Sequence, residues 1–271
     1  MSKKIRVLKA GGTPYEVGYE HGRSYRNDIR RYTAERIQLV CSGLWSGGPM
    51  PRADVLALAE ACLPDHKAYA PALFQELKGL ADATSLSLAE LIIVGGFTDF
   101  VDTVYNAAHQ TTARLPIDDC TAFIVPDDAA EDAGFFGQTW DMHDTATEFV
   151  ILLDVQPDDP PCSLVFTTTG CLGQIGMNEL AGAHNYLLFD KNVLGYNIEA
   201  MSSHHVFTPL AEQPLIHTNH CLLPETLQYS QERPAQAQAS SEARLIKAEA
   251  LLAERPLTIQ HLIDLTRDPD A

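Results

Sequence analysis

The pattern of apolar and polar residues divides the chain into a helical first part and a strand-rich later part. Residues 13–100 have the spacing of amphipathic helices, with Leu73, Leu77 and Leu80 on one expected face. From Cys120 onwards, short apolar runs are separated by Gly, Pro and Asp, which is typical of β-strands joined by turns. Helices, then strands, then helices again predict an α+β layered fold.

Start and stop signals place the helices along the chain. The expected helices cover residues 13–41, 52–62 and 72–83, begin again at Ser87, cover 241–253 and begin again at Thr258. Thr13 to Glu16 combine a capping residue, a proline at the first helical position and an acid in the first turn. Pro64 is expected to stop the second helix, and Ser87 to Glu90 resemble a capping box.

The strands are expected where apolar runs are bounded by turn residues. They cover residues 121–125, 135–140, 148–155, 162–169, 186–189 and 195–200. The last two are expected to form a hairpin around Asp190, Lys191 and Asn192. Residues 107–119 and 228–240 are expected to be exposed connections.

Composition narrows the class of protein. The 271 residues are 45% hydrophobic, which is enough to bury one sizeable core or two small ones. The net charge of −17 disfavours nucleic-acid and membrane-surface partners, because such a surface repels phosphate groups and anionic lipid. The basic N-terminus is followed by no apolar segment, and the longest apolar run, 91–97, is too short to cross a bilayer, so a cytoplasmic location is expected.

Six cysteines lie along the chain without paired spacing, so they are expected to be reduced thiols. Cys120 is the best candidate for chemistry because it follows a polar linker and begins an expected strand. If the bond before it were cleaved, a new α-amine with a pKa of about 7.7 to 8.0 would lie beside its own thiol. The same residue would then supply nucleophile and base. From position alone, a buried strand cysteine is the commoner situation.

The histidines do not predict a metal centre. His217, His220 and Cys221 lie close in sequence, but His217 and His220 would point to opposite faces of an extended strand. A zinc site needs ligands that converge on one point. The glycines form no phosphate-binding pattern, so neither a metal nor a cofactor is expected.

Three sequence blocks resemble the isopenicillin N acyltransferase family of N-terminal-nucleophile hydrolases. They are Cys120-Thr-Ala-Phe123, Gly137-Gln-Thr-Trp-Asp141 and His217-Thr-Asn-His-Cys-Leu-Leu223. Weaker matches are Tyr15 to Gly22 and Gly195 to Glu199. The blocks occur in the family's order over nearly the whole chain.

The resemblance implies a single domain over residues 1–271 with a four-layer αββα sandwich, and a chain that cleaves itself between Asp119 and Cys120. Residues 1–119 and 120–271 would become an α and a β chain that stay associated. Cys120 would then act on small amide or acyl-thioester substrates, with the Asp141 carboxylate orienting the α-amine and the Asn219 amide N–H stabilising an oxyanion.

The chain departs from the family pattern at four places. Asp119 occupies the position at which the best-known family member has glycine. Thr139 occupies a position at which the family often has asparagine. Several dozen family residues have no counterpart after Asn178. The family also carries a site arginine in a segment that would lie beyond Ala271, so we expect the site to lack that group.

Two alternatives remain open from the sequence. One is an unprocessed or inactive family member that binds small molecules. The other is a thiol hydrolase that pairs Cys120 with a separate histidine, such as His143 or His217, and does not cleave itself. Two polypeptides in an intact-mass measurement favour self-processing, and a single one favours either alternative.

Overall fold

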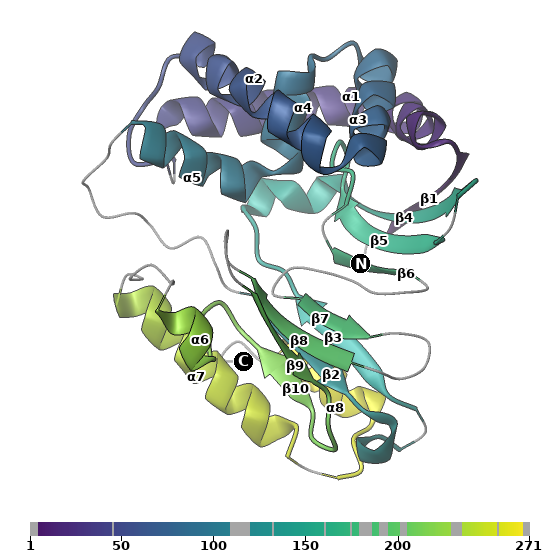
Figure 1. Cartoon of the computed structure of the whole chain (residues 1–271), viewed down its shortest axis with the longest axis vertical. Helices are drawn as coiled ribbons and strands as arrows, with labels where there is room; N and C mark the ends of the chain where they lie inside the picture. Colours follow the sequence, from purple (N-terminus) through teal and green to yellow (C-terminus); the bar gives the residue numbers. More distant parts are fainter. Residues whose placement is uncertain are drawn as a thin grey trace. The chain divides into compact units, whose positions relative to one another are not determined.

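The computed structural model describes most of the chain and divides it into two compact units. The described residues are 5–44, 46–108, 120–131, 133–159, 161–173, 175–178, 186–189, 195–200, 205–228, 235–253 and 255–267. The first unit comprises Met1–Leu115 and His143–Asn178, and the second comprises Pro116–Met142 and Glu179–Ala271 (Figure 1). The first unit therefore includes residues from both sides of position 119.

The first unit packs helices against one side of a sheet (Figure 1). Its helices are α1 (Pro14–Ser42), α2 (Arg52–Tyr69), α3 (Pro71–Thr84), α4 (Leu88–Gly95), α5 (Phe97–Ala107) and the 3-10 segment η2 (Asp144–Phe149). Its strands are β1 (Arg6–Gly12), β4 (Val150–Pro157), β5 (Ser163–Thr168) and β6 (Ile175–Asn178), in the order β1-β4-β5-β6. β1 runs parallel to β4, and the other pairs are antiparallel.

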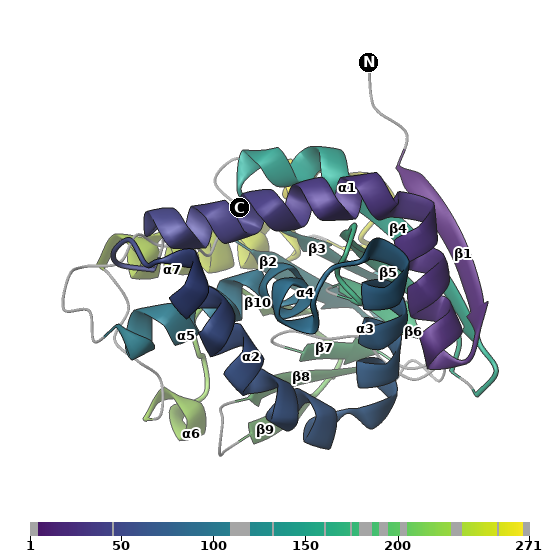
Figure 2. The ribbon, with the colours of Figure 1, turned by 90° about the horizontal axis from the view of Figure 1, so that it is seen from above.

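Local signals account for how α1 begins and packs. Thr13 and Glu16 form the expected capping box. The helix bends at Tyr25, whose φ of −123° and ψ of 25° are not helical (Figure 2). Before the bend, α1 and α3 touch backbone to backbone: a Cβ on Gly18 would lie 1.9 Å from the Glu76 carbonyl oxygen, so only glycine fits there.

The second unit contains two sheets and three helices among its described residues. One sheet has the order β10-β2-β3 and the other has the order β7-β8-β9. The elements are β2 (Thr121–Val125), β3 (Phe135–Thr139), β7 (Tyr186–Phe189), β8 (Gly195–Ala200), β9 (His205–Pro209), β10 (Leu215–His217), α6 (Pro224–Leu227), α7 (Ala235–Leu251) and α8 (Ile259–Arg267), with the 3-10 segment η1 at Asp127–Ala129.

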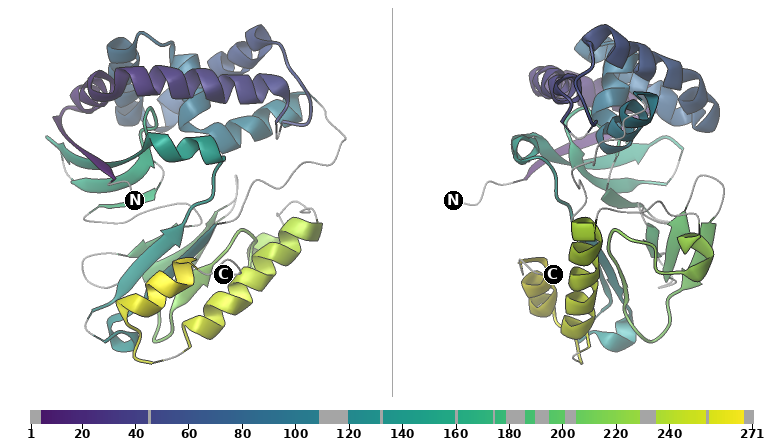
Figure 3. Two further views of the ribbon diagram at one scale, coloured as in Figure 1. Left: turned by 180° about the vertical axis from the view of Figure 1, so that it is seen from behind. Right: turned by 90° about the vertical axis from the view of Figure 1, so that its left-hand side faces the viewer.

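A small apolar core joins α7 and α8 to the β2–β3 hairpin. Its buried residues are Phe123, Val125, Ala129, Ala248, Leu252, Leu257, Leu262 and Leu265. Figure 3 shows the two helices together on one side of these strands. Because β2 lies between β10 and β3, the residue that precedes β2 is held at the end of a central strand.

Most expected elements are confirmed, and the mixed content agrees with an α+β fold. The expectation that Pro64 ends the second helix is wrong, because α2 continues through it to Tyr69. The expected connection 228–240 is partly wrong, since α7 already begins at Ala235. β7 and β8 pair antiparallel as expected, although Asp190, Lys191 and Asn192 lie outside the described residues. Most of the expected connection 107–119 also lies outside them.

The described helices were also compared with the length and hydropathy that a bilayer requires. None of them is long and apolar enough to cross a membrane.

Candidate active site

Cys120 lies directly before β2, half-buried, at the end of a central strand. Its backbone N–H donates a hydrogen bond to the Asn219 side-chain oxygen Oδ1, at 2.9 Å. Asp119, the other residue of the proposed cleavage site, lies outside the described residues. The sequence block at Cys120 and the block at Asn219 are therefore brought into direct contact, although 99 residues separate them.

Asn219 lies in the turn that follows β10. Its backbone N–H donates to the Ser241 hydroxyl at 2.9 Å, and its Oδ1 also accepts from the Arg244 guanidinium at 2.7 Å. Both partners of the side-chain oxygen are donors, so the orientation of the carboxamide follows from the hydrogen-bond network. The oxygen faces the Cys120 nitrogen.

Arg244 is a site residue that the sequence interpretation missed. It lies on α7 with 7% of its surface exposed. Its Nη1 donates to the Cys120 carbonyl oxygen at 2.5 Å and to the Thr121 hydroxyl at 3.0 Å. An arginine from within the chain therefore contacts both Cys120 and Asn219, although the family's arginine in the later segment has no counterpart here.

The β2–β3 hairpin explains how the site accommodates Thr139. Thr121 and Thr139 are register partners, and the Thr121 N–H donates to the Thr139 hydroxyl at 2.9 Å. The threonine thus supplies an acceptor at the first residue of β2. Asp141 follows Thr139 by two residues, so the antiparallel register brings its backbone to the Cys120 end of the hairpin. The Asp141 side chain is exposed, and its role stays a prediction.

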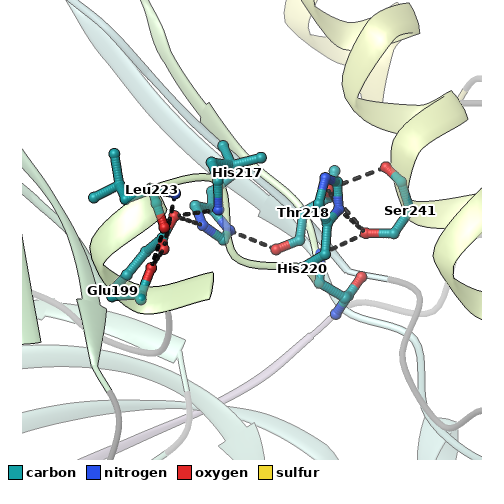
Figure 4. A network of polar contacts seen from close by, with 9 residues as sticks. Glu199, His217, Thr218, His220, Leu223 and Ser241 are labelled. Carbon is teal, nitrogen blue, oxygen red and sulfur yellow. Dashed lines mark hydrogen bonds and ion pairs between the residues drawn. The ribbon is translucent and has the colours of Figure 1, made fainter. Parts of the chain in front are cut away.

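A buried carboxylate lies next to this site (Figure 4). Glu199, on β8, is 0% exposed and accepts from the Leu222 amide at 2.7 Å, the Leu223 amide at 3.3 Å and the Thr226 hydroxyl. His217 Nε2 lies 3.1 Å from the same carboxylate.

The His217 ring contacts an acceptor at each nitrogen. Nδ1 lies 2.5 Å from the Thr218 carbonyl oxygen, and Nε2 faces Glu199. Both ring nitrogens are therefore engaged, one by the Thr218 carbonyl and the other by the buried Glu199 carboxylate.

The two histidines of this block both contact Thr218, but their other partners differ. The expectation that both lie on one strand is wrong, because β10 ends at His217 and His220 lies in the following turn. His220 Nδ1 lies 2.7 Å from the Ser241 hydroxyl (Figure 4). Among the described residues, no group of three His, Cys, Asp or Glu side chains is arranged to hold a metal ion.

Comparison with known proteins supports the family resemblance. No family model matches the chain. The acyl-coenzyme A:6-aminopenicillanic-acid-acyltransferase 40 kDa form of Emericella nidulans is 24% identical to it over 177 residues, which is 65% of this chain and 44% of the relative. This distant similarity supports the resemblance to the isopenicillin N acyltransferase family. It spans less than half the length of the curated relative that it matches.

Two of the strong blocks of the isopenicillin N acyltransferase resemblance are joined through Cys120 and Asn219. The weaker block around Glu199 lies beside them, in contact with His217. The weak block at Tyr15 to Gly22 belongs to the first unit, where Gly18 packs on α3 and His21 Nε2 accepts from the Gly170 amide at 3.2 Å. That block is therefore explained by packing.

Three of the other thiols, those of Cys41, Cys62 and Cys171, have surroundings that fit a packing role. All six cysteines lie in the described residues as free thiols. Cys171 is fully buried, its Sγ donates to the Val94 carbonyl at 3.1 Å, and burial raises its pKa to about 11. Burial also raises the pKa of Cys41 and of Cys62. Such thiols are poor nucleophiles near neutral pH.

The lowered pKa of the buried Glu199 carboxyl predicts that the stability of the protein depends on pH. Burial raises the pKa of this carboxyl, but hydrogen bonds from His217, Thr226 and the Leu222 and Leu223 amides outweigh burial and lower the pKa from 4.5 to about 2. A lowered folded-state pKa stabilises the protein above about pH 4.5, and this contribution is lost as the pH falls towards 2.

We therefore expect the melting temperature of the wild-type protein to fall between pH 4.5 and 2 more steeply than that of Glu199→Gln. The difference corresponds to a free energy of unfolding on the order of 3 kcal/mol. Thermal melts at half-unit pH steps measure it. If the melting temperatures of the two proteins fall equally with pH over this range, Glu199 does not contribute to the pH dependence of stability.

Proposed function

We propose that this chain is a self-processing cysteine N-terminal-nucleophile amidohydrolase or N-acyltransferase, which acts on small amides or acyl thioesters through an acyl-enzyme at Cys120. The observation that carries this proposal is the hydrogen bond from the Cys120 backbone nitrogen to Asn219 Oδ1. That nitrogen is the leaving group of the proposed cleavage and the catalytic α-amine afterwards, so one contact serves both stages.

The first stage is an N-to-S acyl shift at the bond between Asp119 and Cys120. The Cys120 sulfur loses its proton and adds to the Asp119 carbonyl carbon. The carbon–nitrogen bond breaks, and the nitrogen takes up the proton to become the free α-amine. Water then hydrolyses the thioester: its hydroxyl stays on the Asp119 carboxyl group, and its proton returns to the Cys120 thiol.

The second stage uses the same thiol on a substrate. The α-amine accepts the thiol proton, and the sulfur adds to the carbonyl carbon of an amide or thioester. The leaving amine or thiol departs with a proton, and an acyl thioester forms on Cys120. Water or an acceptor amine then takes the acyl group. The relative from Emericella nidulans is named as an acyltransferase, which supports acyl chemistry without fixing the acyl group or acceptor for this chain.

Each site residue has a role that follows from its contacts. Asn219 Oδ1 holds the Cys120 nitrogen, and its amide N–H is proposed to meet the oxyanion of the acyl intermediate. Arg244 fixes the Cys120 carbonyl and the Asn219 oxygen relative to each other. Asp141, at the same end of the hairpin, is proposed to orient the α-amine. No step of the proposal requires a metal or cofactor.

The pairing within the first unit supports a second part of the proposal, that residues 1–119 and 120–271 stay associated after cleavage. β1 pairs with β4 over seven register positions, from Arg6 opposite Ile151 to Gly12 opposite Pro157. A cut before Cys120 leaves this pairing and the packing of α1 on β1 and β4 intact. Each unit also places helices on a sheet, which supports the proposed αββα sandwich.

The surroundings of the histidines favour the α-amine over a separate histidine as the base. A histidine base needs a ring nitrogen that can take the thiol proton. His217 is 2% exposed and uses both ring nitrogens, on Thr218 and Glu199. His143 Nδ1 contacts Thr145 and Asp144.

Asn219 variants test the proposal that the side-chain oxygen of Asn219 holds the Cys120 nitrogen while its amide N–H stabilises the oxyanion. Asn219→Ala is expected to lower turnover by about a hundredfold or more, since an oxyanion donor is lost. Asn219→Asp keeps an acceptor for Cys120 and Arg244 but loses the amide N–H. It is therefore expected to retain more self-cleavage than Asn219→Ala while losing turnover to a similar degree.

The measurements are the self-cleavage rate by mass spectrometry, hydrolysis of a panel of chromogenic N-acyl amides, and the melting temperature. A destabilised Asn219→Ala protein with a normal rate per folded molecule would show that Asn219 is structural and has no catalytic role.

A further inference from the structure

The segment that carries Asn219 is tied at both of its ends to one buried carboxylate. We define the Asn219 loop as residues 218–223, between the end of β10 at His217 and the start of α6 at Pro224. Glu199 contacts His217 before the loop, and it accepts from the Leu222 and Leu223 amides at the end of the loop (Figure 4). The Glu199 side chain on β8 therefore links the two ends of the Asn219 loop.

His217 extends this contact to the peptide group that precedes Asn219. Its Nδ1 donates to the Thr218 carbonyl oxygen, which belongs to the same peptide group as the Asn219 nitrogen. On the other side of that peptide group, the Asn219 N–H donates to Ser241 on α7. The peptide is thus held from β8 and from α7, while the side chain of Asn219 is directed at the Cys120 nitrogen.

We infer that Glu199 and His217 are positioning residues for the reaction at Cys120, and that they act by holding the Asn219 loop so that the Asn219 carboxamide meets the Cys120 nitrogen. This inference rests on the proposed role of Asn219. Neither residue touches the reacting atoms. Partners that orient a catalytic group, themselves held by hydrogen bonds, commonly change rates by about 10- to 100-fold when they are removed.

The burial and charge of the pair fit a positioning role. Glu199 and His217 are 0% and 2% exposed, respectively, and they are joined by one contact, between His217 Nε2 on β10 and Glu199 Oε1 on β8, at 3.1 Å. A buried ion pair is weak evidence for net stability, because removal of two charges from water offsets their attraction. The geometry of the contact between Glu199 and His217 is nevertheless specific, as is expected of residues that hold a loop in one position.

The first test compares Glu199→Gln with Glu225→Gln. Both remove one negative charge, but Glu225 is exposed in the first turn of α6, whereas Glu199 holds the loop. A glutamine at 199 presents an NH2 group where the carboxylate accepts from amides. We expect amide hydrogen exchange at Asn219 to accelerate tenfold or more in Glu199→Gln and to be unchanged in Glu225→Gln, with the Thr121 amide as an internal reference.

The second test asks whether Glu199 acts through Asn219. Self-cleavage is first order and needs no added substrate, so its rate is measured in wild type, Glu199→Gln, Asn219→Ala and the double variant. We expect Glu199→Gln to slow cleavage about 10- to 100-fold in the wild-type background and to have no further effect in the Asn219→Ala background. An equal effect in both backgrounds would overturn the inference.

The two tests separate the inference from the proposed function. If the wild-type chain does not cleave itself, the proposed function fails, and the exchange measurement alone still decides whether Glu199 holds the Asn219 loop. Unchanged Asn219 exchange in Glu199→Gln overturns the inference whatever the cleavage rate. If Glu199→Gln does not fold, His217→Gln takes its place in both tests, because it removes the ring and leaves Glu199 bonded to Leu222 and Leu223.

Discussion

Cys120→Ala is expected to remain one polypeptide indefinitely and to show no turnover. The variant removes the sulfur atom that, in the proposal, attacks the Asp119 carbonyl in self-cleavage and the substrate carbonyl in acyl transfer. Loss of a catalytic nucleophile lowers rates by about 10³-fold at the least. Denaturing mass spectrometry reports the cleavage, and release of a chromogenic amine from N-acyl substrates reports the turnover.

Cys171→Ala and Cys221→Ala are the matched controls for this prediction. Cys171 is buried in the first unit, and Cys221 is half-buried in the Asn219 loop. Both variants are expected to cleave and to turn over at close to wild-type rates per folded molecule. If Cys221→Ala were as inactive as Cys120→Ala, the nucleophile would have to be reassigned to Cys221.

Arg244→Ala is expected to slow self-cleavage by roughly a thousandfold. Its guanidinium donates to the Cys120 carbonyl and to Asn219 Oδ1, at 2.5 and 2.7 Å. Two charge-assisted hydrogen bonds at about 2 kcal/mol each correspond to a change of this size if both act in the transition state. The rate is measured by intact mass over time and is corrected for the folded fraction from a melting curve.

Arg244→Lys keeps the charge but not the planar fork of donors, so it is expected to recover only part of the rate. Arg255→Ala is the control, because that arginine is exposed and bonds only to Leu252 and Gln213 among the contacts described here. A normal cleavage rate in Arg244→Ala would show that the arginine is a packing group of α7.

Much of the fold follows from local sequence signals. The capping residues Thr13 and Ser87 start helices as expected, and the run 121–125 is a strand with the expected bounds. β1 was not predicted, because its residues carry little apolar alternation and its register partners in β4 lie 145 positions later in the chain. A parallel pairing at that separation is set by packing, which the local pattern does not encode.

The candidate site was predictable only where residue types matched a known pattern. Cys120 and Asn219 were found through the family blocks, and the structure brings them into contact. Arg244 was missed because its contacts depend on the docking of α7. A weak signal existed: Ala237, Ser241, Arg244 and Ala248 form the buried face of that helix. An arginine among small residues on a buried helix face indicates that its charge has specific partners.

The hydrogen bonds around Glu199 could not be predicted from the sequence because, like those of Arg244, they depend on how the elements pack. A weak family match included Glu199, but its hydrogen bonds reach residues 18 to 27 positions later in the chain. Which polar groups meet inside a folded unit depends on the approach of β8, β10 and α6 to one another, which residue spacing does not give.

The most direct measurement of the central claim is the intact mass of freshly purified wild-type protein, followed over time under denaturing conditions. The account predicts two polypeptides, one that ends at Asp119 and one that begins with a free α-amine on Cys120, and N-terminal sequencing should read Cys-Thr-Ala-Phe for the second. A single unbroken chain after prolonged incubation, from a protein whose melting curve shows that it is folded, would contradict the account.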